Sequence, residues 1–176
     1  MKKKAFTLAE VLITIGLIGI VAALTMPTLM KMNQEAGIGP MLAKAQYSVE
    51  EAVGRMQLDD IDTSLSDINV ADLMGKLENY LLISDGRLKD GIYIEFSTFD
   101  GTVPTIPSAA GGVYAKVKVD TNGTDVDPNA EGVDQFYFVL SKSGMMVPID
   151  CTKEIANNNW KVPKDYDSES CKSSAN

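Results

Sequence analysis

The residue types that most enzymes use for nucleophilic and metal chemistry are scarce in this sequence. It contains no histidine and only two cysteines, Cys151 and Cys171. Without histidine there is no Ser-His-Asp or Cys-His pair, no histidine general base and no His-ligated zinc or iron site. The two cysteines lie 20 positions apart, so they form no CxxC redox motif and leave room for one disulfide. We therefore expect no catalytic constellation and no enzyme.

Carboxylates and amides are the remaining groups that could bind a ligand, and they concentrate in DTNGTDVDPNAEGVD, residues 120–134. Hard oxygen donors of this kind suit calcium. The candidate ligands are Asp120, Asn122, Asp125, Asp127 and Asp134. The spacing is not that of an EF-hand, because an aspartate stands sixth, where that loop requires glycine. The alternative is an acidic turn built on Asn-Gly and Asp-Pro dipeptides, and the sequence leaves both hypotheses open.

Glu10 is an ionisable residue near the start of a long apolar segment. From Val11 to Met30 the chain carries no charge over 20 residues. As a helix, this stretch would span about 30 Å, the thickness of a bilayer's hydrocarbon core. Residues 2–4 are lysines, so the positive-inside rule places the N-terminus in the cytoplasm and the rest outside. A secretory signal peptide would have a shorter apolar run and a small-x-small cleavage site.

The segment KKKAFTLAEVLITIGLIGIVAALTMP resembles the N-terminus of type IV pilins and pseudopilins. The resemblance implies that a prepilin peptidase removes a short basic leader by cutting between Ala5 and Phe6, and that the new amine of Phe6 is methylated. Ala5 is small, although the family usually has glycine there. The family's glutamate, five residues into the mature chain, matches Glu10. Its helix-bending proline matches Pro27.

Glu10 has two readings at this stage. Thr7-Leu8-Ala9-Glu10 fits a capping box, in which the glutamate closes the first turn of its own helix. The resemblance implies a second use in assembly, where the carboxylate neutralises the Phe6 ammonium of a neighbouring subunit inside a bundle of apolar helices. An unpaired charge at such a depth is costly, so a partner is expected.

Three parts of the chain follow from these observations: a leader at 1–5, a transmembrane and assembly helix at 6–30, and an extracytoplasmic head at 31–176. The formal charge is −8, and loss of the leader with its three lysines would make the remaining chain more acidic still. Such an acidic protein offers no basic face to a phosphate backbone, so we predict no nucleic-acid binding.

In an exported domain, two well-separated cysteines are expected to form a bridge, Cys151–Cys171. Many type IV pilins have a disulfide-bounded C-terminal region of this kind.

Apolar periodicity predicts an α+β head. The tetrapeptide at 37–40, Gly-Ile-Gly-Pro, predicts a bend or a melted turn in the helix that leaves the membrane. Helical spacing after that turn predicts an amphipathic helix whose apolar stripe packs on its own domain. Its apolar positions are Met41, Leu42, Ala45, Val49, Ala52, Val53 and Met56.

A polar loop is expected at 57–67, followed by a second helix that Ser66 or Asp67 caps and Asp85-Gly86 ends. Period-2 alternation predicts strands that begin near Ile92, Val113 and Phe136, with a fourth at 145–149. Helices followed by a run of strands predict a long helix packed on a small antiparallel sheet, the architecture that the resemblance also implies. Trp160 is expected to anchor the C-terminal region to the core.

The resemblance implies a structural subunit of a type IV pilus or of a type II secretion pseudopilus. Its partners would be the prepilin peptidase, an inner-membrane assembly platform and other pilin or pseudopilin subunits. The expected location is a single pass in the inner membrane, with the head in the periplasm or on an extracellular fibre. The major pseudopilins carry calcium in a C-terminal loop, which keeps calcium as the one candidate cofactor. The alternative is a membrane-anchored extracytoplasmic binding module that never polymerises, for which Glu10 would be unnecessary.

Overall fold

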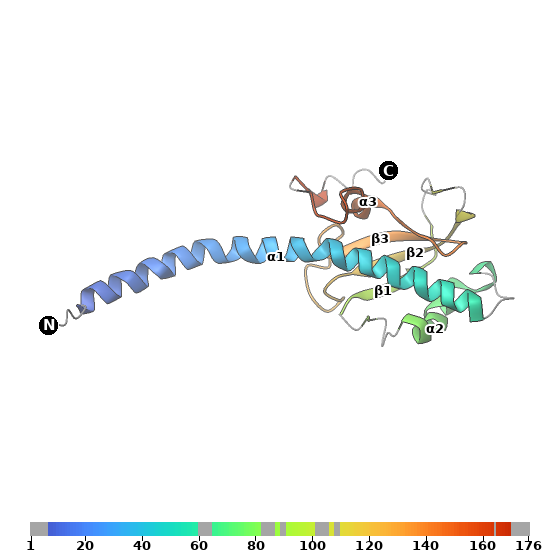
Figure 1. The fold of residues 1–176 in the computed structure, drawn as a ribbon, viewed down its shortest axis with the longest axis horizontal. Coiled ribbons are helices and arrows are strands. Elements are labelled where there is room, and N and C mark those ends of the chain that lie inside the picture. Colours follow the sequence, from blue (N-terminus) through green and yellow to red (C-terminus); the bar gives the residue numbers. More distant parts are fainter. Residues whose placement is uncertain are drawn as a thin grey trace. The chain divides into compact units, whose positions relative to one another are not determined.

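The computed structural model describes residues 7–59, 65–81, 87–88, 91–100, 106–107, 110–163 and 165–169, without the side chains of 27–35 and Ser66. The chain divides into two compact units, Met1–Gly37 and Ile38–Asn176. Figure 1 labels the elements, which are α1 (Leu8–Asp59), η1 (Leu65–Asp67), α2 (Val70–Leu81), β1 (Tyr93–Ser97), β2 (Val113–Asp120), β3 (Gln135–Ser141), β4 (Met146–Pro148) and α3 (Asp150–Asn157). The predicted α+β class is confirmed.

The second unit is built on one antiparallel sheet in the order β1-β2-β3-β4. The register places Val119 of β2 between Ile94 of β1 and Phe136 of β3. Side chains of alternating positions face the core, as period-2 patterning requires. The buried members of this face are Ile94, Ala115, Val117, Val119, Phe136, Phe138 and Leu140. The predicted strands and their inward faces are therefore confirmed, including the short fourth strand.

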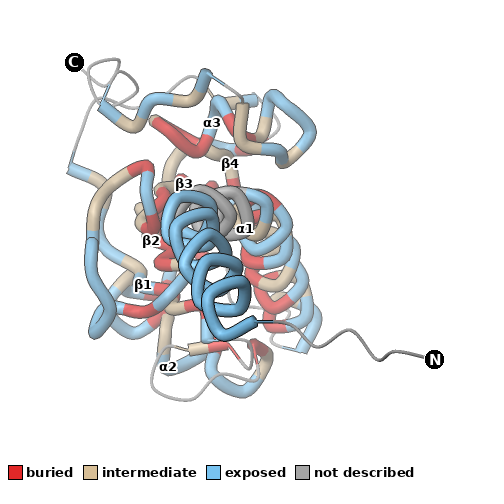
Figure 2. Tube along the Cα trace, turned by 90° about the vertical axis from the view of Figure 1, so that its left-hand side faces the viewer, coloured by how far each residue is buried: buried red, intermediate tan, exposed pale blue. Residues whose placement is uncertain are grey.

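The C-terminal part of α1 covers the core with an apolar stripe that is red in Figure 2. Leu42, Ala45, Val49, Ala52, Val53 and Met56 are buried in one cluster with the sheet and with α2. Full burial of a large aliphatic side chain stabilises by about 1.5–3 kcal/mol, so this stripe is a major attachment of helix to sheet. The predicted amphipathic helix is confirmed. Met41 is an exception, because it is exposed.

Polar side chains of α1 also complete the sheet at β4. The Glu50 carboxylate accepts a hydrogen bond from the backbone N–H of Met146 at 2.8 Å, and the Gln46 side-chain amide donates to the Met146 carbonyl at 3.0 Å. These groups of Met146 would otherwise stay unpaired at the sheet edge. The helix therefore attaches directly to β4.

Several predicted boundaries were wrong. The helix does not break at 37–40, because α1 is continuous from Leu8 to Asp59. The predicted loop at 57–67 is also shorter than expected, since α1 includes its first residues and η1 its last three. The cap of α2 is Asn69, whose side-chain oxygen accepts the N–H of Ala71 at 3.1 Å. It is neither Ser66 nor Asp67, because α2 begins only at Val70. Asp85-Gly86 lies outside the described residues.

The sequence did not predict α3, which covers Asp150–Asn157 after β4. Its buried residues are Cys151, Thr152 and Ile155. The Thr152 hydroxyl accepts the backbone N–H of Tyr137 at 2.8 Å, so this helix continues the hydrogen bonding of β3 beyond the short β4. Only two turns long, α3 lacks the sustained periodicity that a sequence prediction needs.

Candidate functional site

The N-terminal end of α1 is closed by a reciprocal pair of side chains. The Thr7 hydroxyl oxygen accepts the backbone N–H of Glu10 at 3.2 Å, while the Glu10 carboxylate accepts both the Thr7 N–H and the Thr7 hydroxyl at 2.9 Å. This is the capping box that the sequence predicted, and it satisfies donors that the first helical turn leaves unpaired. One carboxylate oxygen makes both bonds. Within the described residues the other accepts none.

The segment behind this cap, Leu8–Met26, is apolar and long enough to cross a membrane. Every residue from Thr7 to Met26 is exposed, which Figure 2 shows as an unbroken pale blue stretch of helix. The hydroxyls of Thr14 and Thr25 donate to backbone carbonyls three and four residues earlier. The segment therefore satisfies its own polar groups while leaving large apolar side chains uncovered. Among the described residues, none buries them.

The predicted cleavage residues Ala5 and Phe6 lie outside the described residues, as do the three lysines before them. Cleavage between Ala5 and Phe6 and methylation of Phe6 therefore stay predictions. What the structure adds is that the helix starts immediately afterwards, at Leu8, with Glu10 in its first turn.

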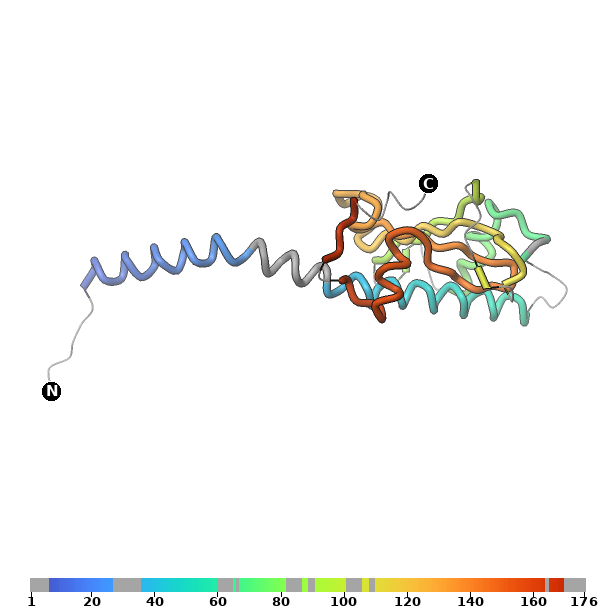
Figure 3. The backbone as a smooth tube through the Cα atoms, turned by 90° about the horizontal axis from the view of Figure 1, so that it is seen from above, coloured from blue at the N-terminus to red at the C-terminus, as the bar shows by residue number. Residues whose placement is uncertain are grey.

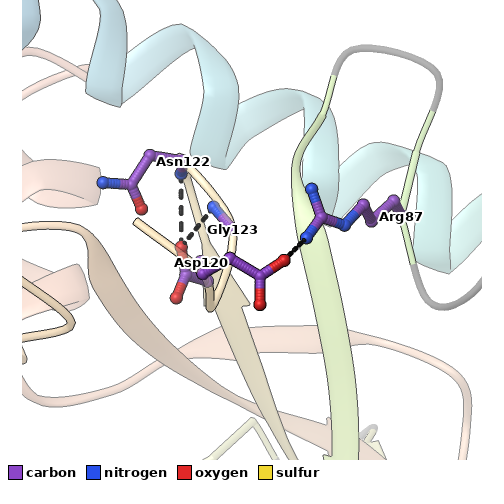
Figure 4. A network of polar contacts seen from close by, with 5 residues as sticks. Arg87, Asp120, Asn122 and Gly123 are labelled. Atoms are coloured by element: carbon purple, nitrogen blue, oxygen red, sulfur yellow. Dashed lines mark hydrogen bonds and ion pairs between the residues drawn. The ribbon is translucent and has the colours of Figure 1, made fainter. Parts of the chain in front are cut away.

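The five candidate calcium ligands lie at the last residue of β2, Asp120, and in the loop that leads to β3, and two of their carboxylates are buried. Asp120 is fully buried, and its Oδ1 accepts the N–H groups of Asn122 and Gly123 at 3.2 and 2.7 Å (Figure 4). Its other oxygen accepts the side-chain amide of Gln135 at 3.3 Å. Asp120 therefore acts as an acceptor for the turn that follows β2.

At the other end of the loop, Asp134 is only 4% exposed. Its two oxygens accept the backbone N–H groups of Asn129 and Ala130 at 2.9 and 2.7 Å. Hydrogen bonds from backbone N–H groups to a carboxylate are about twice as strong as neutral ones, so this residue holds the returning half of the loop. The two buried aspartates thus satisfy the backbone at both ends of the acidic segment.

The remaining candidate ligands point elsewhere. Asp125 forms a 2.6 Å ion pair with Arg87, whose guanidinium packs against Gly123 (Figure 4). Asn122 and Asp127 are exposed. Among the described residues, no three histidine, cysteine, aspartate or glutamate side chains converge on a point where a metal ion could be held. The acidic-turn interpretation accounts for these contacts, and calcium binding stays a prediction.

The C-terminal region packs closely on the head. Cys151 is buried, and its sulfur lies 4.0 Å from the carbonyl oxygen of Ser168. Cys171 lies outside the described residues, so the Cys151–Cys171 bridge remains a prediction. Trp160 is partly buried and stacks on Phe138 with ring centroids 6.3 Å apart, in agreement with the predicted anchor.

Tyr166 joins this region to the acidic loop. Its hydroxyl donates to the carbonyl of Gly132 at 2.8 Å. Burial raises the pKa of Tyr166 far above its usual value, and the nearby carboxylates of Glu154, Glu131 and Asp167 add to the effect. The hydroxyl therefore stays protonated as a donor. The sequence did not point to Gly132, because its close contacts are made only in the folded chain. A Cβ there would lie 2.9 Å from both the Cys151 sulfur and the Tyr166 hydroxyl.

Comparison with protein families places a known motif on this first helix. Residues 1–26 match the family model described as the prokaryotic N-terminal methylation motif. This motif is the prepilin leader of type IV pilins and pseudopilins, and it implies processing by prepilin peptidase and assembly with other pilin subunits. Together with the exposed apolar helix it fits a membrane-anchored protein. Comparisons with curated proteins and with solved structures give no significant match.

Proposed function

We propose that this protein is a structural subunit of a type IV pilus or of a type II secretion pseudopilus. In this proposal, prepilin peptidase cuts between Ala5 and Phe6, the N-terminus faces the cytoplasm, and the head lies in the periplasm or on a fibre. The observation that carries the proposal is the methylation motif at residues 1–26, which coincides with a helical stretch, Leu8–Met26, whose apolar side chains are all exposed.

The exposed helix supports an assembly role through simple energetics. Each fully buried Leu, Ile or Val side chain gains about 1.5–3 kcal/mol relative to water. The stretch Leu8–Met26 leaves eleven such side chains or methionines exposed beyond 40% in the isolated chain. A bilayer can cover them before assembly, and a bundle of identical helices can cover them afterwards. The same surface therefore serves first as an anchor and then as the core of a fibre.

Glu10 is the residue we assign to assembly. Its capping bonds use one carboxylate oxygen and leave the charge of the group in place. In a bundle of apolar helices that charge requires a cation, and the ammonium of a neighbour's Phe6 becomes available only after cleavage. Pairing the two would make each addition to the fibre neutralise one buried charge pair. The cap and the assembly role are compatible, because they use different properties of the same side chain.

A matched pair of variants separates these two roles. Glu10→Gln keeps a side-chain acceptor for the cap but removes the charge. Thr7→Ala removes the hydroxyl of the cap, at a cost of about 1 kcal/mol, but keeps the charge. Each variant is expressed as the only copy, and membrane-extracted and sheared-fibre fractions are compared. We expect both variants to be inserted, cleaved and folded, with only Glu10→Gln lost from fibres. Equal fibre yields for the two variants would show that Glu10 acts only in the helix cap.

N-terminal sequencing of the membrane-extracted chain tests the processing step. The expected mature chain begins at Phe6 with a methylated amine. A chain that begins at Met1, or after Ala23 as a secreted protein would, contradicts the proposal. A chain that is cleaved at Ala5 but never recovered in any fibre supports the anchored binding module instead.

A further inference from the structure

A glycine of α1 lies against the backbone of the C-terminal region. A Cβ atom at Gly39 would stand 1.7 Å from the carbonyl oxygen of Trp160 and 2.5 Å from its carbonyl carbon. Gly39 is buried, and Figure 3 shows the red C-terminal segment beside the start of the cyan helix of the head. No side chain fits in this contact, so the contact requires glycine. We call residues 158–163 the strap.

The strap has a specific conformation. Asn159 and Trp160 both adopt left-handed backbone angles, with φ of 55° and 57°. A bulky residue such as tryptophan rarely takes this conformation and keeps it only when its surroundings enforce it. Here the Trp160 ring stacks on Phe138, and the backbone N–H of Trp160 donates to the Ile155 carbonyl at 3.0 Å. Asn158 closes the turn by donating its side-chain amide to the Lys161 carbonyl at 2.9 Å.

The part of α1 under the strap is the part least able to remain helical alone. Pro40 has no N–H to donate, and Gly37 and Gly39 have lower helix propensity than any residue except proline. The sequence accordingly predicted a melted turn, yet the helix is continuous there.

We propose that the strap holds residues 37–40 of α1 in helical form, and that this stretch is a latent break that opens when the strap lifts. Docked, the strap covers Gly39 and leaves no room there for the backbone to rearrange. Released, it leaves a Gly-Ile-Gly-Pro sequence that favours a bend. This inference concerns the folded head and does not rest on fibre assembly.

Two glycine-to-alanine changes on the same helix test the proposal. Gly39→Ala raises intrinsic helix propensity but collides with the strap, whereas Gly54→Ala raises it with nothing within 4 Å of the new Cβ. Hydrogen exchange is measured on the full chain in detergent micelles, and the emission of Trp160, the single tryptophan, reports on the strap. We expect Gly39→Ala to lose protection at residues 37–42 and to shift the emission to longer wavelength. Gly54→Ala should retain both properties.

Peptides from β2 and β3 provide the control for folding, and they should stay protected in every variant. If Gly39→Ala disrupts the whole head, Asn158→Ala is the milder variant, because it loosens only the turn inside the strap. The expected result is then a smaller loss of protection at 37–42. A strap that is displaced while residues 37–42 stay protected overturns the proposal. So does a loss of protection at 37–42 without any change at the strap.

Discussion

Replacing Asp134 by alanine should destabilise the head. Asp134 is almost fully buried and accepts two backbone hydrogen bonds, from Asn129 and Ala130. A hydrogen bond to a charged group is worth about 1.5–3 kcal/mol, and removing the acceptor also leaves both N–H groups without a partner in the protein. Asn129 is exposed, so water replaces part of the loss there. We therefore expect a cost of about 3 kcal/mol.

The assay is thermal unfolding of the full chain in detergent, followed by circular dichroism. For a head of this size, about 3 kcal/mol lowers the melting temperature by roughly 10 °C. Asp134→Asn retains one oxygen acceptor but places an amide against the second N–H, so it should cost less than the alanine variant. Asp127→Ala is the matched control. It removes an exposed carboxylate that makes no hydrogen bond among the described residues, and should change stability by no more than about 0.5 kcal/mol.

The same measurement distinguishes the acidic turn from a calcium loop. If the aspartates serve the backbone, chelation leaves the melting temperature of the unmodified chain unchanged, and Asp134→Ala is equally destabilised with and without calcium. A calcium loop would instead melt earlier after chelation, and Asp127→Ala would remove that difference. The reasoning would be refuted if Asp127→Ala and Asp134→Ala proved equally harmful.

Three further predictions follow from the C-terminal region and the hairpin between β3 and β4. Cys171→Ser should cost roughly 3 kcal/mol under oxidising conditions and nothing under reducing ones, and equal denaturant midpoints in both buffers would exclude the bridge. Because burial raises the pKa of Tyr166 above the unfolded value of about 10, its contribution to stability is complete below that pH and is lost as pH rises further. Tyr166→Phe should therefore weaken the alkaline loss of stability measured by urea unfolding, while costing about 1 kcal/mol at neutral pH. Gly144→Ala should destabilise the head by about 1–3 kcal/mol in the same assay, because the φ of Gly144 is 87° and a Cβ there would lie 2.8 Å from a Val53 methyl group. An unchanged denaturant midpoint would show that the hairpin can shift to accommodate the new methyl group.

Patterns within one element were readable from the sequence. The charge-free stretch after Glu10, the lysines before it and the Thr7 capping position are local signals, and both the family motif and the helix start agree with them. The strands were found because alternation along β2 and β3 reflects which side chains face the core. For the acidic loop the sequence left calcium binding and an acidic turn both open, because it shows that carboxylates are abundant without showing what they bind.

Contacts between distant segments could not be read in this way. Gly39 looked like a helix breaker because its partner, the backbone of Trp160, lies 121 positions along the chain. The sequence also could not show that Asp120 and Asp134 accept backbone hydrogen bonds, because only the folded loop turns its N–H groups toward them.

The sequence by itself determined that the chain carries a helix long and apolar enough to cross a membrane and continues into an α+β head, because these properties depend on hydrophobicity and periodicity along a single element. The tertiary structure alone decided that α1 remains continuous through Gly-Ile-Gly-Pro and that the acidic loop supports itself. Both outcomes depend on which backbone groups meet across the fold. A weak helical turn persists where another segment packs on it, and a carboxylate becomes structural where buried N–H groups require an acceptor.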